Sequence, residues 1–305
     1  MGFDKVVIWG HKLHTHTHSY VHNGFFRAFQ YLGYPAYWFD DQDDVSDFDF
    51  SNALFLTEGQ VDLEIPLRKD GVYIIHHCSP DKYQGLKQVC IEVYTDNVLK
   101  KSYLKKIEPC IYLDIVGNVI YMPWATHLFP YEIENNKQNL SQVQKQREVH
   151  WIGTLGEGVF GNFTEIDPFR IACEENDISF IAARPDGTGI EEDQHQGLIT
   201  SSYLAPAIVG EWQKRVGYIP CRIFKNISYG QLGVTNSFRV YELFERKIVY
   251  NPNSYELFYD AQARSNTITL EELYELMDFV KTKHTYINRI QTILQFLDLK
   301  GYLHD

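Results

Sequence analysis

Short apolar runs that end at a glycine or at polar residues recur along the first part of the chain and predict buried strands. They cover residues 5–10, 35–39, 53–58 and 71–77, and further strands are expected at 91–95 and 119–122. Residues 25–32 have the apolar spacing of a helix, which Gly33 ends. A strand, a loop, a helix and a strand within residues 5–39 make a βαβ unit, which implies a parallel sheet. The basic run 100–106 is expected to be the solvated face of a helix.

The same pattern starts again in the second half of the chain. It predicts, in order, a strand at 149–153, a glycine-rich loop at 154–162, a helix at 166–175, strands at 178–181 and 198–202, and a helix at 203–214. The glycine spacing of the loop fits neither G-x-G-x-x-G nor G-x-x-x-x-G-K-[ST]. It therefore disfavours a nicotinamide dinucleotide site and excludes an ATPase loop. Amphipathic helices are expected over 269–298, where Thr269 and Glu272 match a capping box.

The composition is that of an ordinary globular protein, with 44% hydrophobic and 22% charged residues, and the length of 305 residues suits two domains. The net charge of -12 argues against nonspecific binding to nucleic acid, which requires a basic surface. The five cysteines form no C-x-x-C pair, so neither a disulfide framework nor a zinc site is predicted, and a reducing compartment is favoured. Because no apolar run approaches a membrane span and no signal peptide is recognised, we expect a cytoplasmic protein without stable membrane insertion.

The stretch 218–236 predicts a turn, a short helix that a glycine ends, and a buried strand. Pro220 suits the start of this helix. Arg222, Lys225 and Asn226 then project near its first turn. Two cations at this place oppose the helix dipole unless an anion is bound, and a diphosphate would meet the helix N-terminus, a guanidinium and an ammonium together. A surface helix with solvated Arg and Lys side chains is the alternative.

The order Arg222-x-x-Lys225, a Ser228-x-Gly230 turn and a hydrophobic strand resembles the segment that holds the donor diphosphate in glycosyltransferases of the GT-B fold. It is similar, more distantly, to the corresponding segment of α1,3-fucosyltransferases, which use GDP-fucose. The likeness covers residues 218–236 only.

The resemblance implies an α/β protein with two Rossmann-like domains that face a cleft, the arrangement called GT-B. Residues 1–131 would form the N-terminal, acceptor-side domain, 132–148 a polar linker, and 149–268 the C-terminal domain that binds the nucleotide-sugar donor. The C-terminal helices of 269–305 would pack back on the first domain. Two successive βαβ patterns agree with this division.

The resemblance also implies which residues contact the donor. In this family the segment before the Arg-x-x-Lys helix contacts the nucleoside, which makes Ser201 and Ser202 candidates, with a pair of helix-capping hydroxyls as the alternative. The predicted donor-binding set is Arg222, Lys225, Asn226, Ser201, Ser202, Gly153, Thr154, Gly156 and Glu242. Glu242 would bond a ribose, with a helix-surface position as the alternative. Retaining members carry a Glu-x7-Glu pair, and the spacing from Glu242 to Glu245 departs from it, which puts a retaining mechanism in doubt.

The loop after the first strand holds five histidines, at the edge of the sheet where ligands bind parallel strands. The strands that end at Glu58 and at His76–His77 should reach the same edge. His14, His16 and His18 alternate, so in an extended segment they share one face. Three uses stay open: a metal site, for which the loop offers no carboxylate or cysteine, an ordinary polar loop, and a general base for an acceptor hydroxyl. By position in the GT-B family the base is predicted at His18, with His16 as the second choice.

These observations together predict a hexosyl- or fucosyltransferase that moves a sugar from a nucleoside diphosphate donor, such as a GDP- or UDP-sugar, to a glycan or small-molecule acceptor. Positive charge at the diphosphate would stabilise the leaving group, so neither a metal nor another cofactor is expected. A histidine base would give inversion. A non-catalytic sugar- or glycan-binding module and a metal-dependent hydrolase that uses His14, His16 and His18 are the alternatives.

Overall fold

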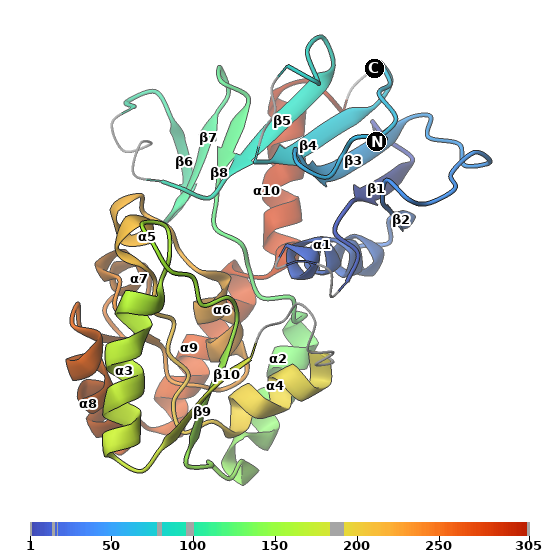
Figure 1. Ribbon diagram of the computed structural model, residues 1–305. Helices are drawn as coiled ribbons and strands as arrows, with labels where there is room; N and C mark the ends of the chain where they lie inside the picture. The colour runs from blue at the N-terminus through green and yellow to red at the C-terminus, as the bar shows by residue number, and fades with distance from the viewer. Residues whose placement is uncertain are drawn as a thin grey trace. The chain divides into compact units, whose positions relative to one another are not determined.

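The protein is an α/β protein, shown as a ribbon in Figure 1, that divides into two compact units. The structure, a computed structural model, describes residues 2–13, 16, 18–77, 81–95, 101–183 and 192–303. The first unit comprises Met1–Pro123 and Tyr286–Asp305, and the second comprises Trp124–Thr285. The first unit has one sheet and the second has two strand pairs, and each unit has its own buried core, in agreement with the two βαβ patterns.

The first unit is built on an eight-stranded sheet with the strand order β2-β1-β3-β4-β5-β8-β7-β6. The pairs from β2 to β8 are parallel, whereas β7 pairs antiparallel with β8 and with β6. Its elements are β1 (Lys5–Trp9), α1 (Ser19–Tyr31), β2 (Ala36–Phe39), β3 (Ala53–Glu58), β4 (Val72–His76), β5 (Lys87–Glu92), β6 (Lys105–Glu108), β7 (Ile111–Asp114), β8 (Val119–Tyr121) and α10 (Tyr286–Leu299). Because β1 lies between β2 and β3, the strand order reverses at β1, and such a switch point is where open α/β sheets bind ligands.

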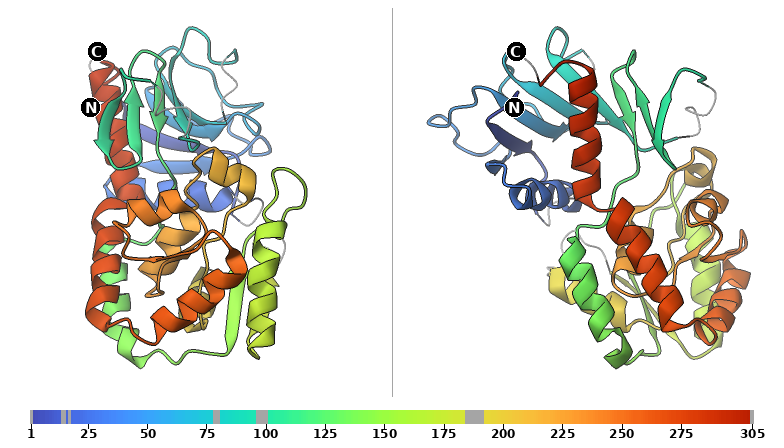
Figure 2. Two further views of the ribbon diagram at one scale, coloured as in Figure 1. Left: turned by 90° about the vertical axis from the view of Figure 1, so that its left-hand side faces the viewer. Right: turned by 180° about the vertical axis from the view of Figure 1, so that it is seen from behind.

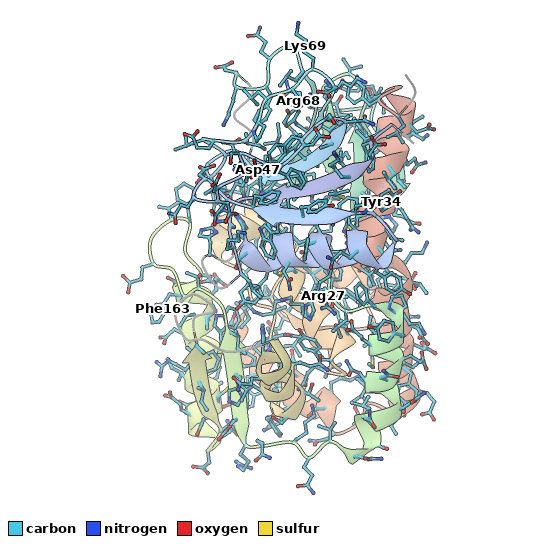
Figure 3. The ribbon with its side chains drawn as sticks, turned by 90° about the vertical axis from the view of Figure 1, so that its right-hand side faces the viewer. Arg27, Tyr34, Asp47, Arg68, Lys69 and Phe163 are labelled. Atoms are coloured by element: carbon cyan, nitrogen blue, oxygen red, sulfur yellow. The ribbon has the colours of Figure 1, made fainter. Side chains whose placement is uncertain are left out.

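The central strands of this sheet are buried on both faces, which explains their continuous apolar sequences. Figure 2 shows α10 running along one face of the sheet, and α10 also packs against α1. Tyr34, labelled in Figure 3, follows α1, and its ring packs on Phe3 and Phe29 with centroid distances of 5.5 and 5.7 Å. Gly33 has φ 84° and ends α1 as predicted.

The second unit holds two parallel strand pairs, β9 with β10 and β11 with β12. Its elements are α2 (Pro130–Asn139), a 3₁₀ turn (Leu140–Gln142), β9 (Glu148–Ile152), α3 (Phe163–Glu175), β10 (Ser179–Ala183), α4 (Glu192–Ser201), α5 (Glu211–Arg215), α6 (Cys221–Ser228), β11 (Val234–Thr235), α7 (Phe238–Leu243), β12 (Val249–Tyr250), α8 (Ser254–Ser265) and α9 (Leu270–Lys283). The segment 203–210 bridges the two pairs, because Tyr203 donates its N–H to Glu148 and Ala207 donates its N–H to Val234.

Two helix boundaries in this unit follow the sequence rules directly. α6 starts after Pro220, and Gly230, with φ 88°, follows it, as the pattern in 218–236 predicts. α9 begins with the predicted capping box: Glu272 donates its backbone N–H to the Thr269 hydroxyl at 3.2 Å, and the Glu272 carboxylate accepts the Thr269 N–H at 2.9 Å.

Several predicted elements differ from the structure. Residues 198–202 end helix α4 instead of forming a strand, and of 203–214 only the last part is helical, as α5. Short apolar runs do not distinguish a strand from a buried helix segment, and here the backbone bonds of 203–210 to β9 and β11 decide the outcome. The basic run 100–106 leads into β6, not into a helix, where cross-strand pairing with β7 overrides its weak strand propensity.

Helix α2 occupies the first part of the expected linker over 132–148, and the boundary between the two units falls after Pro123. Pro130 occupies the first turn, and the Glu132 carboxylate accepts the backbone N–H of Phe129 at 2.7 Å, so this polar stretch has a well-capped start. Of the two C-terminal helices, α10 packs on the first unit as expected, whereas α9 packs on α6 and α2 of the second.

The described cysteines also correct the expectation that the chain forms no disulfide. Cys110, Cys173 and Cys221 carry free thiols, but Cys90 is disulfide-bonded, which cysteine spacing alone does not reveal. None of the helices that the structure describes combines the length and apolar character needed to cross a bilayer.

Candidate functional site

The first candidate site lies at the end of β9 in the second unit, where α6 brings Arg222 against the strand. Cζ of Arg222 lies 3.7 Å from the centroid of the Trp151 ring, and Nη2 donates to the carbonyl of Ile152 at 3.0 Å. Burial lowers the pKa of Arg222, but a guanidinium remains charged over the physiological range. Lys225 lies one turn further along α6, so at i+3 spacing it shares a helix face with Arg222. α6 therefore brings Arg222 to the end of a parallel strand, with Lys225 one turn further along the helix.

Gly153 leaves the space that Arg222 occupies. A Cβ atom at position 153 would lie 2.0 Å from Arg222 Nη2, and the φ of 151° is one that glycine favours. The Gly153 N–H donates to Ala183 on β10 at 3.0 Å. The predicted donor residues Gly153 and Arg222 are thus neighbours in the structure.

The glycine-rich loop after β9 is held by Asn162. Its side chain donates to the Thr154 carbonyl at 3.1 Å and accepts the Gly156 N–H at 3.0 Å, while its backbone N–H donates to the Gly156 carbonyl at 2.9 Å. A Cβ on Gly161 would meet the Gly156 carbonyl oxygen at 2.2 Å, so the loop closes on itself only with glycine there. Thr154 and Gly156 lie in this closed loop next to Gly153.

The remaining predicted donor residues lie in different settings. The buried Asn226 amide donates to the Ala205 carbonyl at 2.9 Å and so ties α6 to the segment 203–210. The buried Ser202 hydroxyl, just after α4, donates to the Leu198 carbonyl at 2.8 Å. The Ser201 hydroxyl, at the end of α4, donates to the Gly197 carbonyl at 3.0 Å. Glu242 lies on α7, 3.5 Å from Arg246, with half of its side chain exposed. These bonds account for the side chains structurally, and none of the four needs a ligand.

The second candidate site is a histidine cluster at the carboxyl ends of β1, β3 and β4 in the first unit. Gly10 and His11 follow β1 with φ values of 80° and 48°, which turns the chain sharply, and α1 then starts after His18. Glu58 ends β3, and His76 ends β4. The strand ends and the histidine loop meet as predicted, at the switch point of the sheet.

Glu58 is the centre of this cluster. One of its carboxylate oxygens, Oε2, accepts from His18 Nδ1 at 2.9 Å and also contacts His11 Nε2. The side chain is only 3% exposed. Burial alone would raise the pKa of Glu58, but the hydrogen bonds from His11 and His18 outweigh it and hold the pKa well below its ordinary value. Glu58 is therefore a buried, ionised carboxylate between two imidazoles.

Two further histidines form a hydrogen-bonded pair of neutral rings beneath the cluster. His22 Nδ1 donates to the Gly10 carbonyl at 2.8 Å, because a carbonyl can only accept, and burial lowers the pKa of His22 to about 3. In the neutral ring Nε2 must then accept, so His76 Nε2 donates to it across 2.9 Å. Burial also lowers the pKa of His76 well below its ordinary value. These tautomers are assigned from the hydrogen bonds.

The structure brings two of the three alternating histidines to Glu58. The His16 ring stacks on His11 with a centroid distance of 4.2 Å, and the His18 ring stacks on His77 at 5.0 Å. His14 lies outside the described residues. The loop itself lacks a carboxylate, as the sequence shows, but the fold supplies one from β3.

Sequence reasoning missed three participants of these sites. Trp151 was assigned only to a buried strand, and the aromatic face that it offers to Arg222 became visible with the fold. His11 was not singled out, although it follows a strand directly. Asn162 closes the glycine loop through its bonds to Thr154 and Gly156, and no local sequence signal assigned it that role.

Comparison with solved structures shows that the chain has the GT-B fold, which confirms the predicted fold class. An alpha-glucosyltransferase in complex with UDP has a TM-score of 0.60 and 9% identity, covering 96% of this chain and 99% of that chain. A trehalose-6-phosphate structure from E. coli bound with UDP-2-fluoro glucose has a TM-score of 0.47 and 10% identity, covering 99% of each chain. No protein-family model matches the sequence, and no curated protein matches it. At 9% identity the likeness shows the fold alone.

Proposed function

We propose that this protein is a glycosyltransferase that moves a sugar from a nucleoside diphosphate donor to a glycan or small-molecule acceptor. The observation that carries the proposal is the placement of Arg222 at the end of β9, over Trp151 and beside Gly153. A guanidinium has five N–H donors, and the Ile152 carbonyl takes one of them. The others suit the oxygens of a diphosphate.

A second feature of the same place favours an anionic ligand. Among the residues that the structure describes, no acceptor lies within hydrogen-bond reach of the buried Trp151 Nε1. A buried donor without an acceptor costs free energy, so it points to an acceptor that a bound ligand supplies. A Cβ at Gly153 would lie 3.8 Å from this nitrogen, so Trp151 Nε1 borders the same glycine as Arg222. A diphosphate oxygen would satisfy it.

These hydrogen-bond donors can stabilise the leaving group. As the bond between the sugar and the diphosphate breaks, negative charge develops on the departing phosphate oxygen, and a fixed guanidinium favours that charge without reorganisation. Lys225, on the same face of α6, adds a second positive charge. We therefore propose that the donor diphosphate needs no metal ion.

For the acceptor we propose His18 as the general base. In the metal-free protein His18 Nδ1 donates to Glu58, so the neutral ring carries its lone pair on Nε2 and can take the proton of an acceptor hydroxyl. Glu58 fixes the ring orientation and stabilises the imidazolium that forms. Direct attack by a deprotonated acceptor on the anomeric carbon inverts its configuration.

The nucleotide base and the sugar of the donor are to be identified by experiment. The alpha-glucosyltransferase that shares the fold was solved with UDP, which makes UDP-sugars the first donors to test, followed by GDP- and dTDP-sugars. The hexosyl and fucosyl alternatives are both covered by this panel. A cytoplasmic location stays a prediction.

The test is the melting temperature of the protein with each sugar nucleotide, in the presence of a chelator. We expect a rise with sugars on one base, since a ligand at a hundred times its Kd adds about 2.7 kcal/mol of stability. The rise should vanish in Arg222→Met. No rise with any donor would overturn the proposal, and a rise without release of nucleoside diphosphate under any acceptor would favour the binding-module alternative instead.

A further inference from the structure

The histidine cluster offers four possible metal-ligand atoms, of which the proposed sugar transfer uses only those of His18 and Glu58. One ligand atom each from His11, His16, His18 and Glu58 lie within 4.8 Å of one another. Three of these residues meet at one atom, because Glu58 Oε2 contacts both His11 Nε2 and His18 Nδ1. The four side chains come from the loop after β1 and from the end of β3, so the fold, not the local sequence, assembles them.

The spacing of these atoms is close to that of a metal site. Four ligands in a tetrahedron around Zn²⁺ lie about 3.3 Å apart, given zinc–ligand distances of roughly 2.0–2.2 Å. His18 Nδ1 and Glu58 Oε2 are 2.9 Å apart and all four atoms lie within 4.8 Å of one another, so no separation must change by more than about 1.5 Å. Three imidazoles with one carboxylate suit Zn²⁺, Ni²⁺ or Cu²⁺, whereas Mg²⁺ and Ca²⁺ prefer oxygen ligands alone.

An ion in solvent can reach the cluster, and hydrogen bonds hold its rings in place. His16 is exposed and His18 is partly exposed, so an ion can enter from solvent, while Glu58 is buried at the base. The His18 backbone N–H donates to His16 Nδ1 at 3.2 Å and keeps the two rings together. Beneath them, the His22–His76 pair and the Gly10 carbonyl form a fixed layer of hydrogen bonds.

We propose that His11, His16, His18 and Glu58 bind one divalent transition-metal ion of the Zn²⁺ class, and that the bound ion and the base function of His18 exclude each other. The ion takes the place between the ring nitrogens and Glu58 Oε2 where the N–H protons now lie. His18 then ligates through Nδ1 and carries its proton on Nε2. The Nδ1 proton leaves to solvent and Nε2 takes one from solvent, so the neutral ring gains and loses one proton.

The bound ring has no lone pair left for an acceptor hydroxyl. Zn²⁺ therefore switches the transferase off without touching the donor residues of the second unit. The effect on turnover rests on the proposed function, but ion binding does not, so the two are measured separately.

The binding experiment uses the full chain after treatment with a chelator and dialysis. Zn²⁺ is titrated by calorimetry, and Co²⁺ is added as a spectroscopic probe whose visible absorption reports its coordination. We expect one Zn²⁺ per chain and no binding of Mg²⁺. Glu58→Gln and His11→Asn should each lower Zn²⁺ affinity by about 100-fold or more. Asn suits position 11, because its φ of 48° lies in the left-handed region that Asn tolerates.

The matched control is His195→Asn, on α4 in the second unit, which removes a histidine outside the cluster. It should leave Zn²⁺ affinity and the Co²⁺ spectrum unchanged. The inference is overturned if the wild-type chain binds no Zn²⁺, or if Glu58→Gln and His11→Asn bind it as the control does.

The second measurement is release of nucleoside diphosphate from the donor found in the melting panel. Saturating Zn²⁺ should lower this rate by at least about 10-fold, while the donor-induced rise in melting temperature persists. Unchanged turnover with Zn²⁺ bound would refute the exclusion of the base. If no nucleotide sugar binds at all, the proposed function fails, and the calorimetry still decides the metal site.

Discussion

The guanidinium of Arg222 lies over the indole ring of Trp151, with Cζ 3.7 Å from the ring centroid. This contact joins α6 to β9, two elements separated in sequence by the glycine loop, α3, β10, α4 and α5. A cation held on an aromatic face keeps its N–H groups in the plane of the guanidinium, pointing past the ring edge. The arrangement fixes the direction in which Arg222 can bind an anion.

Replacing Arg222 by Met tests this role, because Met keeps a long side chain on Trp151 and removes the charge. We expect turnover to fall by about 10²- to 10³-fold, the usual loss for one fixed donor at a developing charge. The free energy of unfolding should change by no more than about 1 kcal/mol, since a buried charge exchanged for an apolar group is often neutral. Donor release assays and denaturant titrations measure the two effects.

Arg215→Met is the matched control for this variant, because Arg215 is an exposed arginine at the end of α5 in the same unit. It should leave both turnover and stability unchanged. Equal losses in the two variants, or normal turnover in Arg222→Met, would contradict the assignment of the diphosphate to Arg222.

Gly153→Ala tests the space beside the guanidinium. The new Cβ would lie 2.0 Å from Arg222 Nη2, and the φ of 151° disfavours alanine, so either the backbone or Arg222 must move. We expect a loss of about 1–3 kcal/mol in unfolding free energy and a donor affinity at least about 10-fold lower. Gly197→Ala is the control: it lies within α4 with no atom near its Cβ, and should stabilise by roughly 0.5–1 kcal/mol. A Gly153→Ala protein that binds donor normally would show that Arg222 is not confined there.

The parts of the fold that could be predicted from sequence are those where one periodicity dominates. The buried strands at Ala53–Glu58 and Val72–His76 carry continuous apolar runs, and the helix after Pro220 has both a start signal and a glycine at its end. For the same reason the meeting of Glu58 with the histidine loop followed from parallel strands alone, since their carboxyl ends share one edge.

The rest depended on contacts between distant segments. Residues 198–202 have an apolar pair and hydroxyls that suit a strand, but the polar helix formers before them extend α4 through Ser201. Nothing local shows that Trp151 faces Arg222, because a buried strand residue can face either side of its sheet. The assignment of Ser202 to the donor stays a prediction, and in the structure its hydroxyl donates to the Leu198 carbonyl of α4.

Arg289 provides a test of the first unit that is independent of catalysis. It is fully buried in α10, its Nε donates to the Pro123 carbonyl at 2.7 Å, and burial lowers its pKa to about 10. Arg289→Ala leaves a cavity and an unmatched carbonyl, so we expect a loss of about 2–4 kcal/mol in denaturant unfolding. Gln291→Ala, exposed on the same helix, should change the free energy by less than about 0.5 kcal/mol. Equal stability of the two variants would refute a structural role for the buried guanidinium.

Glu58→Gln, assayed with a chelator present, tests the base. The amide is nearly the same size as the carboxylate, but it cannot hold His18 with the Nδ1 proton and the Nε2 lone pair that the reaction needs. We expect release of nucleoside diphosphate to fall by roughly 10²- to 10⁴-fold, while the donor-induced rise in melting temperature stays unchanged. Glu64→Gln, an exposed glutamate on the loop after β3, is the control and should keep full turnover. If Glu58→Gln turns over within about two-fold of the wild type, the proposed pair, with His18 as the base and Glu58 as the group that orients it, is refuted.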